Sequence, residues 1–436
     1  MKAIAMNFAV AFFLSNHGKR TMVFWLKCLD KEFTYILAKG SKQGLAILSP
    51  KRYFSTSIFE SIHKQMKLQK LLSGLVLMLL ASNALEAQFR KYSNEFLNIG
   101  AGARGLGMGG TQIATVQDAT SGYWNPAGLV NVKNNPQLSV MWANYFSGIA
   151  NYEFVGLALP TKNPDRVLGI SYLRFGVNDI PNTLYLVQPD GSINYNNIST
   201  FSSTDNAVLL SYSEKYKDIK GFKVSFGGNA KIIYRKVGTF AQAWGFGLDA
   251  GVQLSKKNWK LGAVLKDATT TFTAWSFSFT DREKEVLYLT NNDIPVKSTE
   301  NTAPRLILGT AYTFNINKDF HVLAEANMNV TFDGKRNTLI SSNIASIDPT
   351  IGVEANYQRT LFVRLGISNF QKALSDGDLT NQKKVWIYQP SLGAGFKVGN
   401  LGLDYAFTNL ANQDNPLYTH IISAKLDLVK QPKYIR

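Results

Sequence analysis

The stretch that decides how this chain folds runs from Phe96 to Leu129 and reads FLNIGAGARGLGMGGTQIATVQDATSGYWNPAGL. Its first part is dense in glycine, which allows positive φ and close approach of other backbone. Near its end, Asn125-Pro126 is a turn signal, because proline fixes its own φ and disfavours the α region at the preceding residue. We predict a compact plug that packs against the following chain, with a motif formed by Gly105, Gly107, Gly109, Gly110, Asp118, Trp124, Asn125, Pro126 and Gly128.

A nucleotide-binding loop is the strongest competing interpretation of this stretch. Residues 100–105 and 105–110 each fit the pattern G-x-G-x-x-G. A dinucleotide fingerprint also requires a preceding strand, a following helix and an acidic residue about 20 positions further on. Here residues 111–116 are rich in β-branched side chains without helical spacing, and the nearby acid, Asp118, comes too early. We therefore predict no nucleotide site and no cofactor.

The rest of the chain repeats one pattern, in which apolar residues alternate with small or polar ones. In the segment 401–408 the odd positions are apolar and the even positions are small or polar. Strand side chains alternate between two faces, so such a segment has one apolar face and one wet face. About fourteen segments of this kind lie near 136–147, 151–160, 167–178, 205–216, 222–236, 243–256, 259–269, 304–316, 320–332, 348–359, 361–370, 385–398, 400–409 and 418–428.

The connections between these segments also alternate in length. Tight turns are expected at 162–165, 256–258, 317–319 and 399–400, and long irregular loops at 179–204, 270–303, 333–347, 371–384 and 410–417. Bacterial outer-membrane barrels have an even number of strands, short periplasmic turns and longer extracellular loops. Aromatic residues gather near the segment ends, as interfacial girdles require. The sequence therefore predicts an all-β fold: a transmembrane antiparallel β-barrel of about 14 strands with an N-terminal glycine-rich plug, rather than a soluble β-sandwich.

Alternation also assigns side chains to the inside of the predicted barrel. This inward face carries charged, amide and glycine residues instead of an apolar core. The lumen-facing polar candidates are Asp249, Glu325, Glu354, Arg364 and Lys397. We expect them to fix the plug through ion pairs, with the lining of a permeation path as the alternative. Within the plug, Asp118 is expected to cap or stabilise a turn, with an ion pair to Arg104 as the alternative.

The N-terminal region contains one long apolar run, residues 71–81. It follows a short basic start at Met66 and precedes small residues that end at Ala87, which are the parts of a secretory signal peptide. A helix that crosses a bilayer needs about 20 apolar residues, more than this run supplies. The predicted organisation is a mis-started or disordered extension at 1–65, a signal peptide at 66–87, the plug at 88–134 and the barrel at 135–436.

Charge and cysteine content exclude several classes of function. Residues 1–87 hold 12 of the 47 basic and 4 of the 30 acidic side chains, which leaves a net charge of +9 on the rest. No basic stripe with stacking aromatic residues occurs, so we expect no nucleic-acid partner. Cys28, the single cysteine, lies before the predicted cleavage site. The mature chain would therefore have no disulfide, no thiolate metal site and no cysteine nucleophile.

Candidates for catalysis or metal binding are few. His321 and His420 lie near the ends of separate strand-like segments, without a helical H-x-x-x-H partner or a carboxylate at a zinc-like spacing. Ser121-Gly122 is not part of a G-x-S-x-G elbow. We expect no metal ion, no catalytic residue and no enzymatic activity.

The stretch Phe96–Leu129 also carries a family resemblance. It resembles the opening of mature PorV/PorQ-family outer-membrane proteins of Bacteroidetes-type bacteria. More distantly, Asp118-Ala119 followed by Asn125-Pro126-Ala127-Gly128-Leu129 is similar to the N-terminal segment of FadL-type transporters of hydrophobic compounds. Both resemblances imply a barrel in the outer membrane of a Gram-negative bacterium, surrounded by lipid after cleavage of the signal peptide.

The two resemblances imply different functions. The PorV/PorQ resemblance implies a type IX secretion component that binds or shuttles secreted proteins through their C-terminal sorting domains and contacts other secretion-system subunits. The loops 179–204 and 270–303 would then be the binding regions. The FadL resemblance implies a transporter of hydrophobic small molecules, in which the plug shifts and an apolar pocket lies between plug and wall.

Overall fold

The computed structural model divides into two units, Met1–Glu86 and Ala87–Arg436, each of which is described by itself. It describes strands at 12–16, 19–28 and 31–38, and the residues 93–188, 190–296, 298–374, 384–409 and 418–428. The predicted signal peptide at 66–87 lies outside the described residues.

The first unit contains a small antiparallel sheet with the strand order β1-β2-β3. Its strands are β1 (Phe12–Asn16), β2 (Lys19–Cys28) and β3 (Lys31–Ala38). Strand β2 is rich in β-branched and aromatic side chains, which favour strands. We interpreted residues 1–65 as a mis-started or disordered extension, and the described residues of this range form the sheet. The mis-started origin of residues 1–65 stays a prediction.

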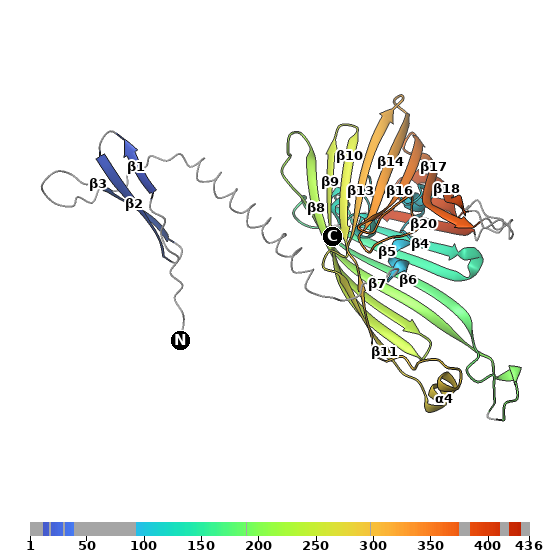
Figure 1. Ribbon diagram of the computed structural model, residues 1–436. Coiled ribbons are helices and arrows are strands. Elements are labelled where there is room, and N and C mark those ends of the chain that lie inside the picture. Colours follow the sequence, from blue (N-terminus) through green and yellow to red (C-terminus); the bar gives the residue numbers. More distant parts are fainter. Residues whose placement is uncertain are drawn as a thin grey trace, which may run out of the picture. The chain divides into compact units, whose positions relative to one another are not determined.

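In the second unit, consecutive strands pair in an antiparallel way and close into a barrel (Figure 1). The strands are β4 (Gln137–Tyr145), β5 (Ala150–Pro160), β6 (Arg166–Asn182), β7 (Ser199–Lys215), β8 (Lys223–Val237), β9 (Ala241–Lys256), β10 (Trp259–Lys266), β11 (Thr271–Phe277), β12 (Ser298–Thr302), β13 (Arg305–Asn315), β14 (Phe320–Thr331), β15 (Ile340–Ser341), β16 (Ser346–Tyr357), β17 (Leu361–Leu374), β18 (Lys384–Val398), β19 (Leu401–Thr408) and β20 (Thr419–Asp427). Strand β20 pairs with β4, so the sheet has no open edge.

The wall has fourteen strand positions within the described part of the chain. Strands β10 and β11 both pair with β9 and share one position, and β12 and β13 together form the next. The two-residue strand β15 pairs with β16 beside the wall. Each position corresponds to one of the fourteen alternating segments, so the predicted barrel is confirmed.

Side-chain alternation decides which residues face the surrounding medium and which face the lumen. In β9, Trp244, Phe246 and Leu248 are exposed on the outside, whereas Ala243 and Asp249 are buried inside. This is the inverse of a soluble domain, because the large apolar side chains lie on the outer surface. An outward apolar band of this kind suits a lipid environment.

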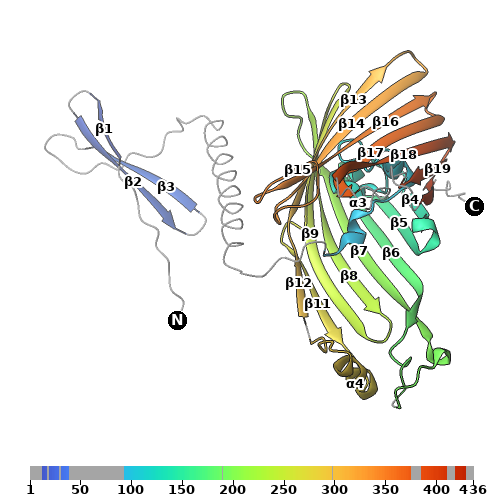
Figure 2. The same cartoon turned by 45° about the vertical axis from the view of Figure 1, so that its right-hand side comes forward.

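The outer end of the barrel differs from the predicted loops. Residues 179–204 and 270–303 were expected to be irregular, and this expectation is wrong for much of their length. Strand β6 continues to Asn182 and β7 starts at Ser199, while the second range contains β11, β12 and the helix α4 (Asp281–Leu289). Figure 2 shows these strands reaching beyond the rest of the wall towards α4. Extended neighbours satisfy each other's backbone groups there, and a capping box of Thr280 and Glu283 starts α4.

The predicted plug lies within the barrel as a chain of short helical turns. These are η2 (Glu95–Asn98), α2 (Ala103–Gly107), α3 (Ser121–Trp124) and η3 (Pro126–Asn131). The main hydrophobic cluster joins plug and wall, since Tyr123 and Trp124 pack with the fully buried Tyr152, Phe154 and Leu173. The core of this unit is therefore the contact between plug and wall. None of the helices in the described residues is both long and apolar enough to cross a membrane.

Candidate functional site

Glycines on the inner face of the wall allow the plug backbone to lie directly against the strands. A Cβ atom on Gly366 would lie 2.1 Å from the backbone nitrogen of Gly109, and one on Gly352 would lie 2.5 Å from the carbonyl oxygen of Met108. On the plug side, a Cβ on Gly107 would lie 3.0 Å from the Cα of Gly393. The glycine-rich stretch and the inward glycines of the wall are therefore two halves of one close contact.

The Asn-Pro turn is held by a different part of the wall. Asn125 donates from Nδ2 to the carbonyl oxygens of Ile113 (2.9 Å) and Val252 (3.1 Å), while its Oδ1 accepts from the backbone of Ala127. Pro126 begins η3, where its missing N–H is not needed. A Cβ atom on Gly251 would lie 2.2 Å from Oδ1 of Asn125. The turn predicted from Asn125-Pro126 is therefore also a docking point of the plug.

Two further motif residues shape the plug from within. The indole Nε1 of Trp124 donates to the carbonyl oxygen of Ala101 at 2.7 Å, which ties α3 to the start of α2. A Cβ atom on Gly128 would lie 2.3 Å from the carbonyl oxygen of Val116, and one on Gly105 would lie 2.8 Å from the Trp124 ring. Gly109 and Gly110 adopt positive φ, at 66° and 80°. These positions explain why the stretch requires glycine.

A chain of buried ion pairs connects the plug to three strands. Arg104 of α2 pairs with Glu354 of β16 at 2.8 Å, Glu354 also pairs with Arg364 of β17 at 2.6 Å, and Arg364 pairs with Asp404 of β19 at 2.7 Å. Glu354 and Arg364, two of the lumen-facing candidates, are both buried in this chain of ion pairs. The alternative ion pair of Arg104 with Asp118 does not form, because the guanidinium of Arg104 pairs with Glu354 instead.

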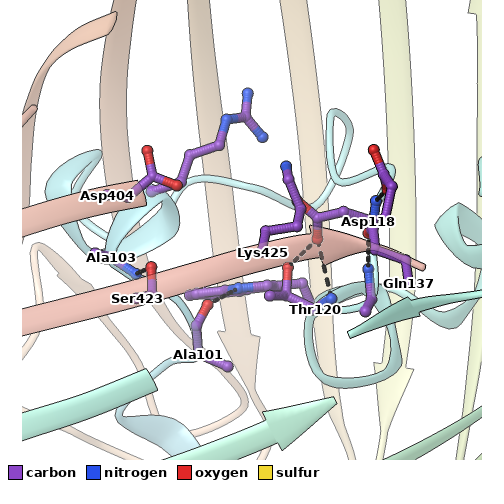
Figure 3. Close-up of polar contacts among 12 residues, drawn as sticks. Ala101, Ala103, Asp118, Thr120, Gln137, Asp404, Ser423 and Lys425 are labelled. Carbon is purple, nitrogen blue, oxygen red and sulfur yellow. Dashed lines mark hydrogen bonds and ion pairs between the residues drawn. The ribbon is translucent and has the colours of Figure 1, made fainter. Parts of the chain in front are cut away.

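Asp118 stabilises a turn and also pairs with the wall. Its Oδ1 accepts from the backbone nitrogen (2.9 Å) and the hydroxyl (2.6 Å) of Thr120, as expected for a turn residue. Its Oδ2 lies 3.1 Å from Nζ of Lys425 on β20. Figure 3 shows these groups together, with Ser423 of the same strand accepting from the backbone of Ala103. Burial opposes ionisation, but Lys425 and the Thr120 hydrogen bonds hold the pKa of Asp118 at about 2.

The other lumen-facing candidates have different surroundings. Glu325 accepts from the backbone of Ala114 (2.8 Å) and the hydroxyl of Thr115 (2.5 Å). Asp249 pairs with Lys231 at 2.8 Å, and Lys231 also contacts Asp267. Lys397 has inward parity in β18 but lies exposed at the strand end, away from the plug.

Sequence reasoning missed several polar residues that hold the plug. Gln253 donates to the carbonyl oxygens of Ile113 and Val116, and Asn229 donates to that of Gly122. Both side chains have the inward parity of their strands, so alternation was an available signal. The two histidines have local partners: His321 lies 3.0 Å from Oδ1 of Asn315, and His420 lies 2.8 Å from the hydroxyl of Tyr405. Among the residues that the structure describes, no three His, Cys, Asp or Glu gather as a metal site.

Above the plug, a cavity of about 760 Å³ forms an outer vestibule. The plug contributes apolar side chains to it, including Phe96, Ile99 and Trp124. The wall contributes mainly polar and charged groups, among them Arg235 and Arg305. The vestibule is therefore amphipathic, and its floor is the plug itself.

Next to the vestibule, the extended outer wall forms an apolar groove of about 490 Å³. Its aromatic lining is Phe201, Phe240, Trp275, Phe277 and Phe279. The rings of Trp275 and Phe277 stack with centroids 6.2 Å apart, and those of Phe240 and Phe279 with centroids 5.9 Å apart. Arg235 lies 5.0 Å above the Trp275 ring and also lines the vestibule, so the two spaces adjoin. We refer to this space as the aromatic groove.

The aromatic groove was not predicted from the sequence. Trp275, Phe277 and Phe279 lie in residues 270–303, which were interpreted as an irregular loop. The alternation of Thr271, Thr273, Trp275 and Phe277 on the inner face was a usable signal for a strand. The FadL resemblance implies an apolar pocket between plug and wall; the aromatic groove lies further out, along the extended strands.

Comparison with known proteins gives similarities only among solved structures. No family model matches the chain, and no curated protein matches it. The Ralstonia pickettii toluene transporter TbuX has a TM-score of 0.46 at 13% identity, over 76% of this chain and 99% of that one. The Pseudomonas putida toluene transporter TodX has a TM-score of 0.45 at 13% identity, over 78% and 98%. A Pseudomonas aeruginosa FadL homologue has a TM-score of 0.45 at 13% identity, over 75% and 98%.

Proposed function

We propose that this chain is a plugged outer-membrane barrel that binds apolar small molecules at its outer end and passes them inward when the plug moves. The observation that carries the proposal is the aromatic groove, a space of about 490 Å³ beside the vestibule. Small-molecule sites are concave, mostly apolar and flanked by a few polar groups. The groove has this composition, because aromatic rings line it and Glu300 and Asn182 are among its few polar residues.

The groove favours an apolar ligand for a direct physical reason. Removing apolar surface from water contributes about 25 cal/mol per Å². The stacked rings of Trp275, Phe277 and Phe279 offer flat faces on which a hydrocarbon can lie. Arg235 connects this surface to the vestibule, since its guanidinium lies 5.0 Å from the ring centroid of Trp275 and 6.0 Å from that of Phe96 in the plug. A ligand that leaves the groove would meet the plug next.

The experiment uses the purified chain in nanodiscs and a matched pair of variants. Phe277→Ala/Phe279→Ala removes the two rings that stack beyond Trp275, whereas Phe272→Ala removes a ring on the outward face of the same strand. Binding is measured as quenching of tryptophan fluorescence by a bromine-labelled aromatic hydrocarbon and by a bromine-labelled fatty acid. We expect the double variant to bind at least fivefold more weakly and Phe272→Ala to bind as the unchanged chain does. Equal quenching of all three proteins would contradict the proposal.

A second candidate function, the binding of secreted proteins in type IX secretion, is favoured by a different observation. Large apolar side chains are exposed around the outer loops and α4: Tyr195 is 72% exposed, Tyr288 76% and Val296 76%. Exposed apolar clusters often mark protein contact sites. A photo-crosslinker at Tyr288 in intact cells would capture proteins that share a C-terminal sorting domain. Capture of no such protein, together with normal secretion by a deletion strain, would exclude this candidate.

A further inference from the structure

A cavity of about 460 Å³ opens at the other end of the barrel, beneath the plug and beside the short turns. Short turns mark the periplasmic end of an outer-membrane barrel. The cavity is bounded by the end of the plug at residues 130–134, the turn after β5 and the first or last residues of β7, β8, β9 and β10. Its ionisable lining is formed by Lys133, Lys162, Asp165, Lys215, Lys223 and Lys260. Five ammonium groups therefore share one cavity with a single carboxylate.

Three of these lysines lie on the inward face of their strands, because side chains alternate between the two faces of a strand. Lys215 has the parity of the buried Ser213 in β7, Lys223 has that of Ser225 in β8, and Lys260 has that of the inward Gly262 in β10. They are thus an extension of the lumen lining and not part of the lipid-facing surface. This placement separates them from the lysines of the exposed turns.

The lysines of the cavity lack the acidic partners that other inward lysines have. Lys231 pairs with Asp249, and Lys425 pairs with Asp118. Within the described ranges, no carboxylate oxygen lies within 4.0 Å of any of the five cavity lysines. Like charges that share a cavity with few counter-charges raise its electrostatic free energy, so an anion that enters is stabilised.

The short segments that flank the described part of this unit are basic. Residues 429–436 read VKQPKYIR, with three basic and no acidic side chains. Residues 88–92 read QFRKY, with two basic and no acidic side chains. Neither segment supplies an acidic side chain.

We propose that this periplasmic cavity binds a phosphate ester. Lysine binds phosphate as a point charge, and several lysines around one space suit a group with two negative charges. Hydroxyl donors for the remaining oxygens come from Thr161, Ser225 and Ser255 in the same lining. Val130, Val132, Val224 and Leu254 line the cavity as well, and they leave an apolar surface for the organic part of the ester. This site is distinct from the aromatic groove and does not depend on the proposed uptake function.

A binding measurement on the purified chain in neutral detergent tests the site. The soluble probe is glycerol 3-phosphate, and the lipid probes are dihexanoyl phosphatidic acid and dihexanoyl phosphatidylcholine. The variant Lys223→Gln/Lys260→Gln removes two inward charges at nearly constant size. Lys318→Gln, in the turn between β13 and β14 and outside the cavity, is the matched control. Isothermal titration gives the dissociation constants.

We expect the double variant to bind the phosphate probe at least tenfold more weakly, and Lys318→Gln to stay within twofold of the unchanged chain. Binding of glycerol 3-phosphate assigns a soluble ester, whereas binding of phosphatidic acid alone assigns a lipid head group. Binding should weaken as salt rises, because exposed charges are screened. If the double variant does not fold, Lys223→Gln alone serves the same comparison. Absence of binding by every probe, equal affinity of variant and control, or tighter binding of a hexaglutamate peptide than of both phosphates would overturn the proposal.

Discussion

At the scale of single residues, the inward glycines have a role that their alternation alone did not indicate. They were interpreted as small residues on a wet face. In the folded chain, Gly366, Gly352 and Gly251 are in contact with plug atoms. The physical reason is distance: the plug approaches the strand backbone this closely only where the strand residue carries no side chain.

Gly366→Ala tests this contact. Its Cβ would lie 2.1 Å from the nitrogen of Gly109, so the plug or the strand must shift. We expect a loss of about 1–3 kcal/mol in stability, the usual cost of overpacking, measured as a lower thermal midpoint in detergent. Gly402→Ala is the control, because its Cβ would have no neighbour nearer than 3.7 Å. A thermal midpoint that falls equally in both variants would argue against a specific contact between the plug and Gly366.

The contribution of Asp118 to stability, and its dependence on pH, also belongs to the scale of single residues. Its pKa is about 2 in the folded chain, below the ordinary value of 3.8, although burial alone would raise it. A carboxylate with a depressed folded pKa stabilises above its unfolded pKa, and this stabilisation is lost as pH falls through the folded value. The difference in thermal midpoint between the unchanged chain and Asp118→Asn should therefore be constant from pH 8 to about 5 and disappear between about 4 and 2. A difference that already disappears near pH 6 would contradict the pair with Lys425.

At the scale of elements, periodicity predicted the strands of the wall well and their outer ends poorly. Each alternating segment became a wall position because one face of it is apolar over its whole length. Beyond the lipid-facing band that constraint ends, so β6 and β7 continue through polar sequence that resembled a loop. Their continuation depends on pairing with each other, which a single segment does not reveal.

At the scale of the whole molecule, the plug closes the barrel through contacts that come from distant parts of the chain. Glu354 is the centre of one such contact, since it pairs with Arg104 of the plug and Arg364 of the wall. Removing Glu354 breaks the pair of Arg104, while Arg364 keeps Asp404, and a broken buried pair costs about 3–5 kcal/mol. The closed state thus depends on a few buried charges as well as on packing.

Conductance across a planar bilayer tests this dependence. We expect the unchanged chain to stay closed and Glu354→Gln to show frequent openings, because Arg104 loses its anchor. Glu214→Gln is the matched control: its pair with Arg166 is exposed, and such pairs contribute about 0–1 kcal/mol. Openings in the control, or a Glu354→Gln variant as closed as the unchanged chain, would show that other contacts hold the plug.

The sequence by itself determined the barrel, its strand positions, its short-turn end and the side of the wall on which Glu354 and Arg364 lie. Each of these follows from local periodicity, which every segment carries within itself. Only the tertiary structure decided which wall glycines contact the plug and which carboxylate pairs with Arg104. It also decided where the aromatic rings of 270–303 form a groove. These features depend on residues far apart in the chain, and their distances are set only when the sheet closes around the plug.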